Sequence, residues 1–169
     1  VSLGASDPHD LASLALNALA EVNAQASVDI VLGKAGGNHA ALRERAAALP
    51  FEVHLHVGIE NMAGFLAATD LSIGAVGTTA WERCCLALPT IALITAENQV
   101  RAAEALESNG AVLIAGRHDD ISASRLASAI AALVHDPNRL SSMSREAAMV
   151  CDGRGTSRVI DTIAHHYNE

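Results

Sequence analysis

Aromatic side chains are scarce in this 169-residue sequence: Phe, Tyr and Trp make up 2% of it, although half of the residues are hydrophobic. Ala, Leu, Ile and Val therefore supply most of the apolar surface. Small aliphatic side chains of this kind suit helices that pack closely on a parallel sheet. The length is that of one domain with room to bury a substantial core.

Concentrated positive charge is also lacking. The formal net charge is -8, and Lys and Arg form no dense stripe along the chain. A general nucleic-acid surface needs many cations to neutralise phosphates, so the sequence argues against a nucleic-acid partner. An anionic nucleotide stays compatible with the charge, because backbone N–H groups and helix dipoles bind phosphate without charged side chains.

Segments that mark a membrane or secreted protein are missing as well. No apolar run approaches 20 residues, and no basic segment followed by an apolar one opens the chain. Cys84, Cys85 and Cys151 are odd in number and fit neither a disulfide framework nor a zinc pattern, so we expect a cytoplasmic protein. The sequence opens on Val1 without a Met, and we expect residues 1–169 to be one domain of a longer chain.

Short β-branched or apolar runs alternate with longer, Ala- and Leu-rich amphipathic runs. This alternation predicts βαβ units and a mostly parallel sheet covered on both faces. Right-handed crossovers make it a doubly wound, Rossmann-like α/β sandwich with about six parallel strands. The expected strands are 1–3, 28–32, 52–57, 71–74, 90–94 and 111–114, and the expected helices lie near 8–24, 38–48, 60–68, 78–87, 97–109, 120–135, 137–150 and 156–167.

Two loops after predicted strands are suited to phosphate. The first, Gly4-Ala5-Ser6-Asp7, precedes a helix that Pro8 is expected to open, and the second is Gly74–Thr79. Each joins glycine to a helix start, where free N–H groups and the positive dipole end attract anions. An ordinary turn is the open alternative for the first loop. Asp7 suits a phosphate poorly, and we interpret it as a helix cap or a contact on the sugar side.

Glu82 lies five residues after Gly77, about one turn inside the predicted helix. A carboxylate at that place can accept both ribose hydroxyls while phosphates bind the N–H groups before it. A solvated helix face made by Glu82 and Arg83 explains these residues equally well, and the two interpretations stay open.

The run Gly77–Pro89, Gly-Thr-Thr-Ala-Trp-Glu-Arg-Cys-Cys-Leu-Ala-Leu-Pro, resembles the signature of the UDP-sugar hydrolases of pseudaminic acid biosynthesis. Those hydrolases are relatives of the peptidoglycan N-acetylglucosaminyltransferase within the GT-B superfamily. The resemblance covers roughly residues 1–115 and continues in the segments 2–8, 57–63, 68–74 and 96–99. It implies that this chain is the C-terminal, nucleotide-binding domain of such an enzyme.

The resemblance also implies a UDP-sugar site. Its residues would be Ile59 and Met62 for the uracil, Glu82 for the ribose, Gly4, Ala5, Ser6, Gly77, Thr78 and Thr79 for the diphosphate, and Asn98 and Gln99 for the sugar or the distal phosphate. The implied reaction is hydrolysis of a UDP-linked diacetamido-trideoxy-hexose to free sugar and UDP, without a cofactor. The catalytic base would be a histidine in a preceding domain, so the chain alone is expected to bind without turnover.

Three other functions are alternatives to this one. A GT-B glycosyltransferase would use the same site with a sugar acceptor in place of water. A non-catalytic nucleotide-sugar-binding module is a second alternative. An NAD-dependent oxidoreductase fits poorly, since the loop that begins at Gly4 lacks the G-x-G-x-x-G spacing and no acid ends the second strand.

Single residues that suggest other chemistry have plainer explanations. His54 and His56 share one face of a strand but lack a third ligand, so no metal is expected. Cys84 and Cys85 lie in the apolar half of a predicted helix, which favours buried packing over a nucleophile. Trp81 suits either stacking on a base or packing between helix and sheet.

Overall fold

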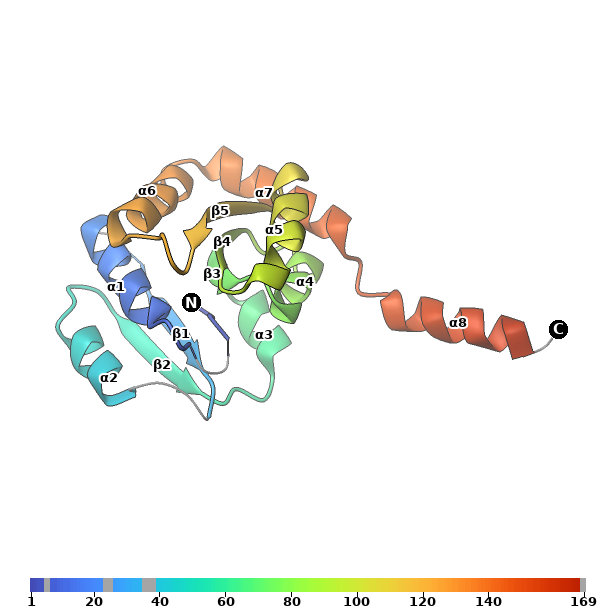
Figure 1. The fold of residues 1–169 in the computed structure, drawn as a ribbon, viewed down its shortest axis with the longest axis horizontal. Helices are drawn as coiled ribbons and strands as arrows, with labels where there is room; N and C mark the ends of the chain where they lie inside the picture. Colours follow the sequence, from blue (N-terminus) through green and yellow to red (C-terminus); the bar gives the residue numbers. More distant parts are fainter. Residues whose placement is uncertain (5–6, 23–25, 35–38, 168–169) are drawn as a thin grey trace.

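A computed structural model of the chain describes residues 1–4, 7–22, 26–34 and 39–167 (Figure 1). Strands and helices alternate along it, as the sequence predicts. The strands are β1 (Val28–Leu32), β2 (Val53–Val57), β3 (Ser72–Ala75), β4 (Thr90–Ile94) and β5 (Val112–Arg117). The helices are α1 (Leu11–Val22), α2 (His39–Ala47), α3 (Met62–Ala67), α4 (Thr78–Cys85), the 3₁₀ helix η1 (Glu97–Gln99), α5 (Val100–Ser108), α6 (Ala123–Val134), α7 (Pro137–Val150) and α8 (Gly155–Tyr167).

All strand pairs are parallel, and Ser2 joins them into one array. β1 pairs with β2, and β3, β4 and β5 form a second group. Ser2 bridges Val31 of β1 on one side and Gly74 of β3 on the other. Its N–H donates to the Ile73 carbonyl at 2.9 Å, and its carbonyl accepts from the Ala75 N–H at 3.2 Å. The order is therefore β2, β1, Ser2, β3, β4, β5.

Of the six strands that the sequence predicts, the one at residues 1–3 is not formed as a strand in the described residues. Only Ser2 makes strand-like bridges, and Gly4 turns the chain out of the sheet with φ +97°. That backbone conformation is open to glycine and rarely to other residues. The described residues thus form five strands, with the sixth reduced to a bridge.

Helices cover both faces of the sheet, which confirms the predicted α/β sandwich. Side chains of α1 and α6 form one apolar cluster with β1 and β4, and those of α4, α5 and α7 form a second with β4 and β5. β4 is buried throughout and alternates between the two: Ile91 and Leu93 join the first cluster, Ala92 and Ile94 the second. Alternation of this kind is what a strand covered on both faces requires.

The start of α1 corrects one prediction and confirms another. The helix begins at Leu11, so Pro8 is not its first residue; residues 7–10 instead form a turn closed by the Asp10 N–H on the Asp7 carbonyl at 3.2 Å. The Asp7 carboxylate accepts from the Leu11 N–H at 3.0 Å and the Ala12 N–H at 2.9 Å. Asp7 is thus a helix cap, although it precedes Pro8 and lies four residues before the first residue of the helix.

Asp7→Ala is expected to lower the free energy of unfolding by about 1–2 kcal/mol, since two N–H groups lose their acceptor and the helix dipole its counter-charge. Urea denaturation of both proteins measures the change. Asp7→Asn is the matched control, because Asn also tolerates the φ of +38° found here and keeps one acceptor oxygen. We expect it to lose about half as much. An Ala variant as stable as the parent would contradict the capping role.

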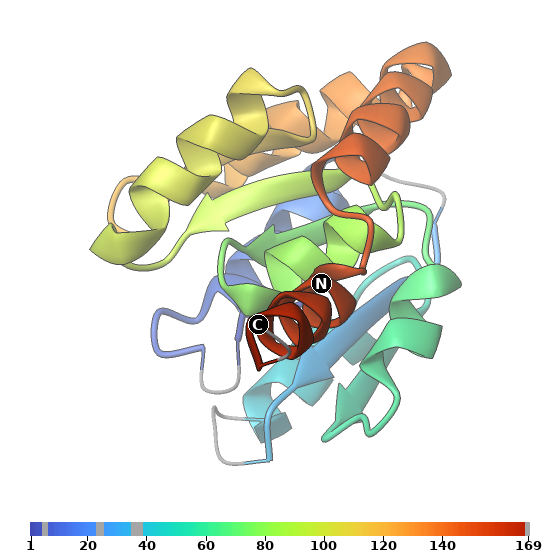
Figure 2. The ribbon, with the colours of Figure 1, turned by 90° about the vertical axis from the view of Figure 1, so that its right-hand side faces the viewer.

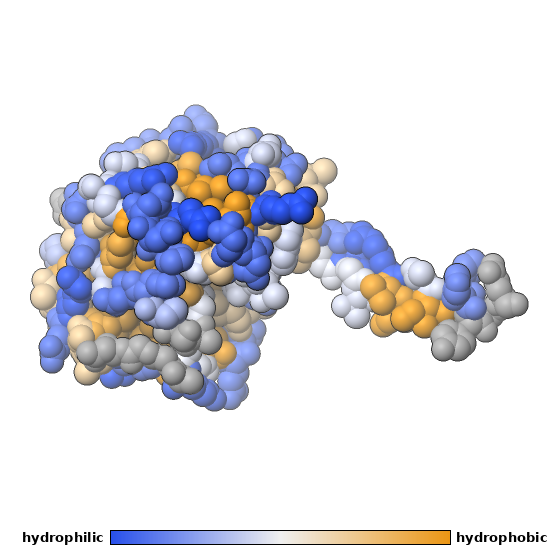
Figure 3. Space-filling model, in the orientation of Figure 1, coloured by the Kyte–Doolittle hydropathy of each residue, from blue (hydrophilic) through white to orange (hydrophobic). Residues whose placement is uncertain are grey.

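α8 projects from the α/β body (Figure 1), and Figure 2 views the molecule from the side on which it projects. Its apolar side chains Val159, Ile160 and Ile163 are 59%, 59% and 52% exposed. Figure 3 shows an apolar patch on the projecting helix. None of the helices in the described part of the chain is long and apolar enough to cross a membrane.

Candidate functional site

The predicted site residues follow strand ends at one edge of the sheet. Because every strand pair is parallel, the loops after Ser2, β2, β3 and β4 all leave from the carboxyl edge. Ile59 follows β2, Gly77 follows β3, and Asn98 follows β4. Ligands of open parallel sheets bind at this edge, next to the point where the strand order reverses. Here that point is Ser2, between β1 and β3.

The N-terminus of α4 is open to a ligand. Gly77 is its N-cap, with φ −98° and ψ −157°, and no side chain among the described residues caps it. A Cβ added at Gly77 would meet nothing within 4 Å. Thr78 is exposed and Thr79 half-buried, whereas Val76 is 4% exposed and packs into the core. Uncapped N–H groups and the positive end of the helix dipole therefore face the carboxyl edge.

The first glycine loop is built differently. The Asp7 carboxylate occupies the N–H groups of Leu11 and Ala12, so the free donors that the sequence analysis expected at the start of this helix are taken. Gly4 is exposed, and Ala5 and Ser6 lie outside the described residues. Among the described residues, α4 is thus the helix start of the two that no side chain caps, and the contacts expected of Gly4, Ala5 and Ser6 stay predictions.

Glu82 and its neighbour Arg83 have opposite environments. Glu82 is exposed, and its carboxylate makes no hydrogen bond or ion pair with any described residue. Arg83 is 1% exposed. The interpretation of both residues as a solvated helix face is therefore right for Glu82 and wrong for Arg83. The Arg83 Nη2 donates to the Ala75 carbonyl at 2.6 Å. Its Nε and Nη1 are buried without a partner in the described part of the chain.

The guanidinium of Arg83 lies directly on the backbone of β3. A Cβ at Gly74 would come within 2.3 Å of its Nη1, so only glycine leaves room for it. Burial lowers the pKa of Arg83 to about 10, although nearby Cys84 and Glu82 act in the opposite direction. Sequence reasoning missed this contact; the available signal was Gly74 itself, since glycine inside a strand marks a close approach.

The residues expected near a uracil lie between β2 and α3. Gly58 turns the chain with φ +67°, and Ile59 after it is half-buried. Asn61 caps α3 by accepting the Gly64 N–H at 3.0 Å, which fixes the start of the helix at Met62. The Met62 side chain is half-buried. Ile59 and Met62 are thus partly accessible, and their contacts with a uracil stay predictions.

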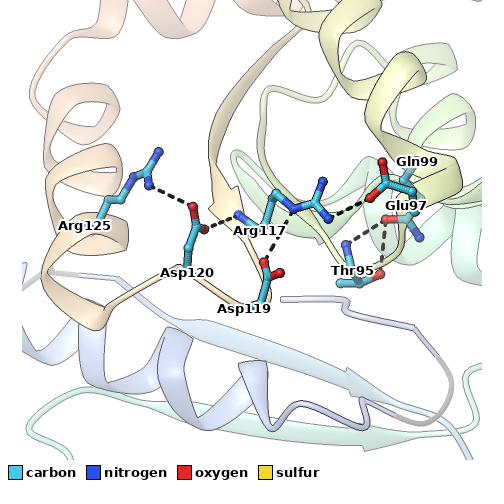
Figure 4. Close-up of polar contacts among 7 residues, drawn as sticks. All are labelled: Thr95, Glu97, Gln99, Arg117, Asp119, Asp120 and Arg125. Atoms are coloured by element: carbon cyan, nitrogen blue, oxygen red, sulfur yellow. Dashed lines mark hydrogen bonds and ion pairs between the residues drawn. The ribbon is translucent and has the colours of Figure 1, made fainter.

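On the sugar side, hydrogen bonds hold the loop after β4 in place. The Gln99 Oε1 accepts from the Thr95 N–H at 3.0 Å and from the Thr95 hydroxyl at 3.1 Å (Figure 4). Asn98, beside it on η1, is exposed. Gln99 therefore shapes the loop through its side-chain oxygen, while Asn98 is open to a ligand.

Arg117 is a cation at this edge that sequence reasoning did not select. Figure 4 shows its guanidinium between Glu97 and Asp119. The Arg117 Nη2 is 2.8 Å from the Glu97 Oε2, and the Arg117 Nε is 3.5 Å from the Asp119 Oδ1. The backbone N–H of Arg117 donates to the Asp120 carboxylate. The hydrogen bond that Arg117 donates to the Glu97 carboxylate raises the pKa of Arg117. The predicted strand ended at Ile114, before the arginine, whereas β5 continues to Arg117.

A histidine pair links two loops at the same edge. The rings of His9 and His118 stack with centroids 3.9 Å apart and an interplanar angle of 16°. His9 belongs to the turn before α1, and His118 follows β5. The stack therefore holds the turn before α1 against the loop after β5.

Two other features lie away from this edge. A cavity of about 550 Å³ opens at the amino ends of the strands, beside Val1, Val28 and Ser72, and is separate from the loops above. His54 lies 3.3 Å from Glu52, and the His56 Nε2 is 2.6 Å from Asp29. No group of three metal-ligating side chains gathers in the part of the chain that the structure describes.

Comparison with known proteins agrees with this architecture. No family model matches the sequence. The spore coat polysaccharide biosynthesis protein SpsG of Bacillus subtilis is 27% identical over 172 residues, which cover 100% of this chain and 50% of SpsG. The crystal structure of MurG from Acinetobacter baumannii superposes with a TM-score of 0.77 at 20% identity, over 98% of this chain and 48% of MurG.

Two further structures match equally completely. A putative UDP-N-acetylglucosamine 2-epimerase from Listeria monocytogenes gives a TM-score of 0.73 at 18% identity, covering 99% of this chain and 45% of that one. CalG4, the calicheamicin glycosyltransferase, gives a TM-score of 0.70 at 18% identity, covering 99% of this chain and 41% of CalG4. The fold is that of a GT-B C-terminal domain. The chain spans about half the length of the proteins it matches.

Proposed function

We propose that residues 1–169 are the UDP-sugar-binding half of a two-domain enzyme of polysaccharide biosynthesis. The observation that carries the proposal is the α4 N-terminus: an uncapped helix start at Gly77, followed one turn later by the exposed, unpaired Glu82. The four residue steps from Thr78 to Glu82 span about 6 Å along the helix axis. One nucleotide can therefore place its phosphates on the N–H groups and its ribose at the carboxylate.

The chemistry of such a site follows from its charges. UDP leaves the sugar as negative charge grows on its phosphates, and donors already oriented toward them stabilise that charge. Thr78 and Thr79 add hydroxyls beside the N–H groups. The nucleophile and its base come from the domain that precedes this one, in a reducing compartment such as the cytoplasm. This chain positions the donor and stabilises the leaving group.

Two reactions fit this half of the site. The resemblance of Gly77–Pro89 to the pseudaminic acid hydrolases favours water as the acceptor and a UDP-linked diacetamido-trideoxy-hexose as the substrate. The match to CalG4, a glycosyltransferase, over 99% of this chain favours a sugar acceptor just as well. UDP release by the full-length protein without an added acceptor would identify the hydrolase; release that depends on an acceptor would identify the transferase.

Calorimetric titration with UDP, UMP, CDP and NAD tests the site itself. We expect selective binding of UDP, and Glu82→Ala to weaken it by about 1–3 kcal/mol, or roughly 5- to 150-fold, because the ribose hydroxyls lose their acceptor. Glu82→Gln, which keeps an acceptor oxygen, is the control and should lose less. Binding of NAD, equal affinity for CDP and UDP, or no UDP binding by the full-length protein would refute the UDP assignment.

A further inference from the structure

Two cysteines far apart in sequence meet where α8 leaves the body. Cys85 is the last residue of α4, and Cys151 is the C-cap residue that follows α7. They are 66 positions apart, and their sulfurs are 3.1 Å from each other. Cys85 is exposed and Cys151 half-buried, whereas Cys84 is 2% exposed. The buried packing expected for both neighbours is therefore right for Cys84 and wrong for Cys85.

The segment between α7 and α8 contacts Cys85 at a second point. Gly153, with φ +72°, lies so close that a Cβ on it would be 3.6 Å from the Cys85 Sγ, and its backbone N–H acts to lower the pKa of that thiol. Asp152 holds the rest of the segment by accepting from the Arg154 N–H at 3.0 Å and pairing with Arg158. The exposed thiol of Cys85 thus lies against the segment through which α8 is attached.

We propose that Cys85 and Cys151 form a redox-responsive pair that closes to a disulfide by exchange with a low-molecular-weight disulfide such as oxidised glutathione. The thiolate of one cysteine attacks a sulfur of the oxidant and releases one thiol, which leaves a mixed disulfide. The second cysteine then attacks the protein-bound sulfur and releases the second thiol. Two electrons and two protons pass from the cysteine pair to the oxidant, which is reduced to two thiols.

The geometry permits this closure with a small movement. A disulfide holds its sulfurs about 2.05 Å apart, so the two atoms must approach by about 1 Å. Cys151 has extended backbone angles, φ −144° and ψ 115°, and lies outside the helix, so the segment it opens can supply the shift. Hydrogen bonding to Cys151, with a smaller effect of burial, raises the pKa of Cys85. Exchange should therefore accelerate above neutral pH as the thiolate population grows.

Closure would attach α8 to the helix that carries the candidate site. α4 bears Thr78 and Glu82 as well as Cys85, and the segment 151–154 is the only covalent connection between α7 and α8. The disulfide would therefore fix the direction in which α8 leaves the body. This inference stands on the cysteine geometry and does not depend on the proposed nucleotide site.

The test is a redox titration of the full-length protein in glutathione buffers, followed by acid quenching, alkylation and peptide mapping. We expect the Cys85–Cys151 disulfide to form in the parent and in Cys84→Ala, and to be absent from Cys85→Ser and Cys151→Ser. Full alkylation of both thiols in oxidised glutathione would overturn the proposal. Glutathione adducts without the internal disulfide, or a disulfide through Cys84, would overturn it as well.

A second measurement tests the attachment of α8. Trypsin cleavage after Arg154, in the exposed segment, should slow about tenfold in the oxidised parent, because the opening that cleavage needs is restrained. Dithiothreitol should restore the faster rate, and Cys85→Ser should cleave at the fast rate in either buffer. Equal rates for the oxidised and reduced parent would overturn the restraint.

Discussion

Gly77→Asp is expected to stabilise the fold while abolishing nucleotide binding. Its backbone angles suit any residue, and an added Cβ meets nothing within 4 Å. The carboxylate would cap α4 and complement its dipole, raising the free energy of unfolding by about 0.5–1 kcal/mol. The same charge would occupy the donors proposed for the diphosphate and repel it, lowering UDP affinity by about 100-fold or more, a loss near 3 kcal/mol. Urea denaturation and calorimetry measure the two effects on the same sample.

Gly77→Asn separates capping from charge. Asn caps a helix about as well as Asp but is neutral, so it should stabilise α4 with an affinity loss of about tenfold at most. A Gly77→Asp variant that binds UDP as the parent does would place the diphosphate elsewhere. A variant that loses both binding and stability would mean only that the loop is damaged, and the Asn variant would then show the same stability loss.

Most of the fold could be predicted because its signal is local. The β-branched runs that became β1 and β4 were predicted at their observed bounds, and α7 likewise at 137–150. Errors arose where one residue outweighed the pattern. Gly4 turns the chain out after a single bridging residue, and the Asp7 carboxylate starts α1 three residues beyond Pro8. Neither effect can be read from hydrophobic periodicity.

The candidate site divides in the same way. Glycine and threonine at a helix start identify the α4 loop from sequence, because the chemistry of a helix N-terminus is local. The exposure of Cys85 beside buried Cys84 depends on where α7 ends, which is a tertiary property. Arg83 is the clearest case: next to a glutamate it resembles a surface residue, and only its approach to Gly74 shows that it is buried.

The close approach of Arg83 to Gly74 predicts a large loss of stability when a single methyl group is added at Gly74. Gly74→Ala is expected to lower the free energy of unfolding by about 3 kcal/mol or more, because its methyl group would lie 2.3 Å from the Arg83 Nη1 and 2.7 Å from its Cζ. Arg83 is fully buried and bonded to the Ala75 carbonyl, so it cannot move aside into solvent. Circular dichroism during urea unfolding measures the loss.

Arg83→Met supplies the control for the mechanism of that loss. Met is flexible and apolar, so it leaves room for a methyl group and removes a desolvated charge; by itself it should change stability by about 1 kcal/mol or less. In the Arg83→Met background, Gly74→Ala should cost about 1 kcal/mol, which gives a coupling energy of about 2 kcal/mol in the double-mutant cycle. An equal cost in both backgrounds would show that the guanidinium is not what excludes the side chain. In that case the sheet itself would require the glycine at position 74. The contact of Arg83 with β3 would then not be the interaction that fixes α4 and its open N-terminus against the end of that strand.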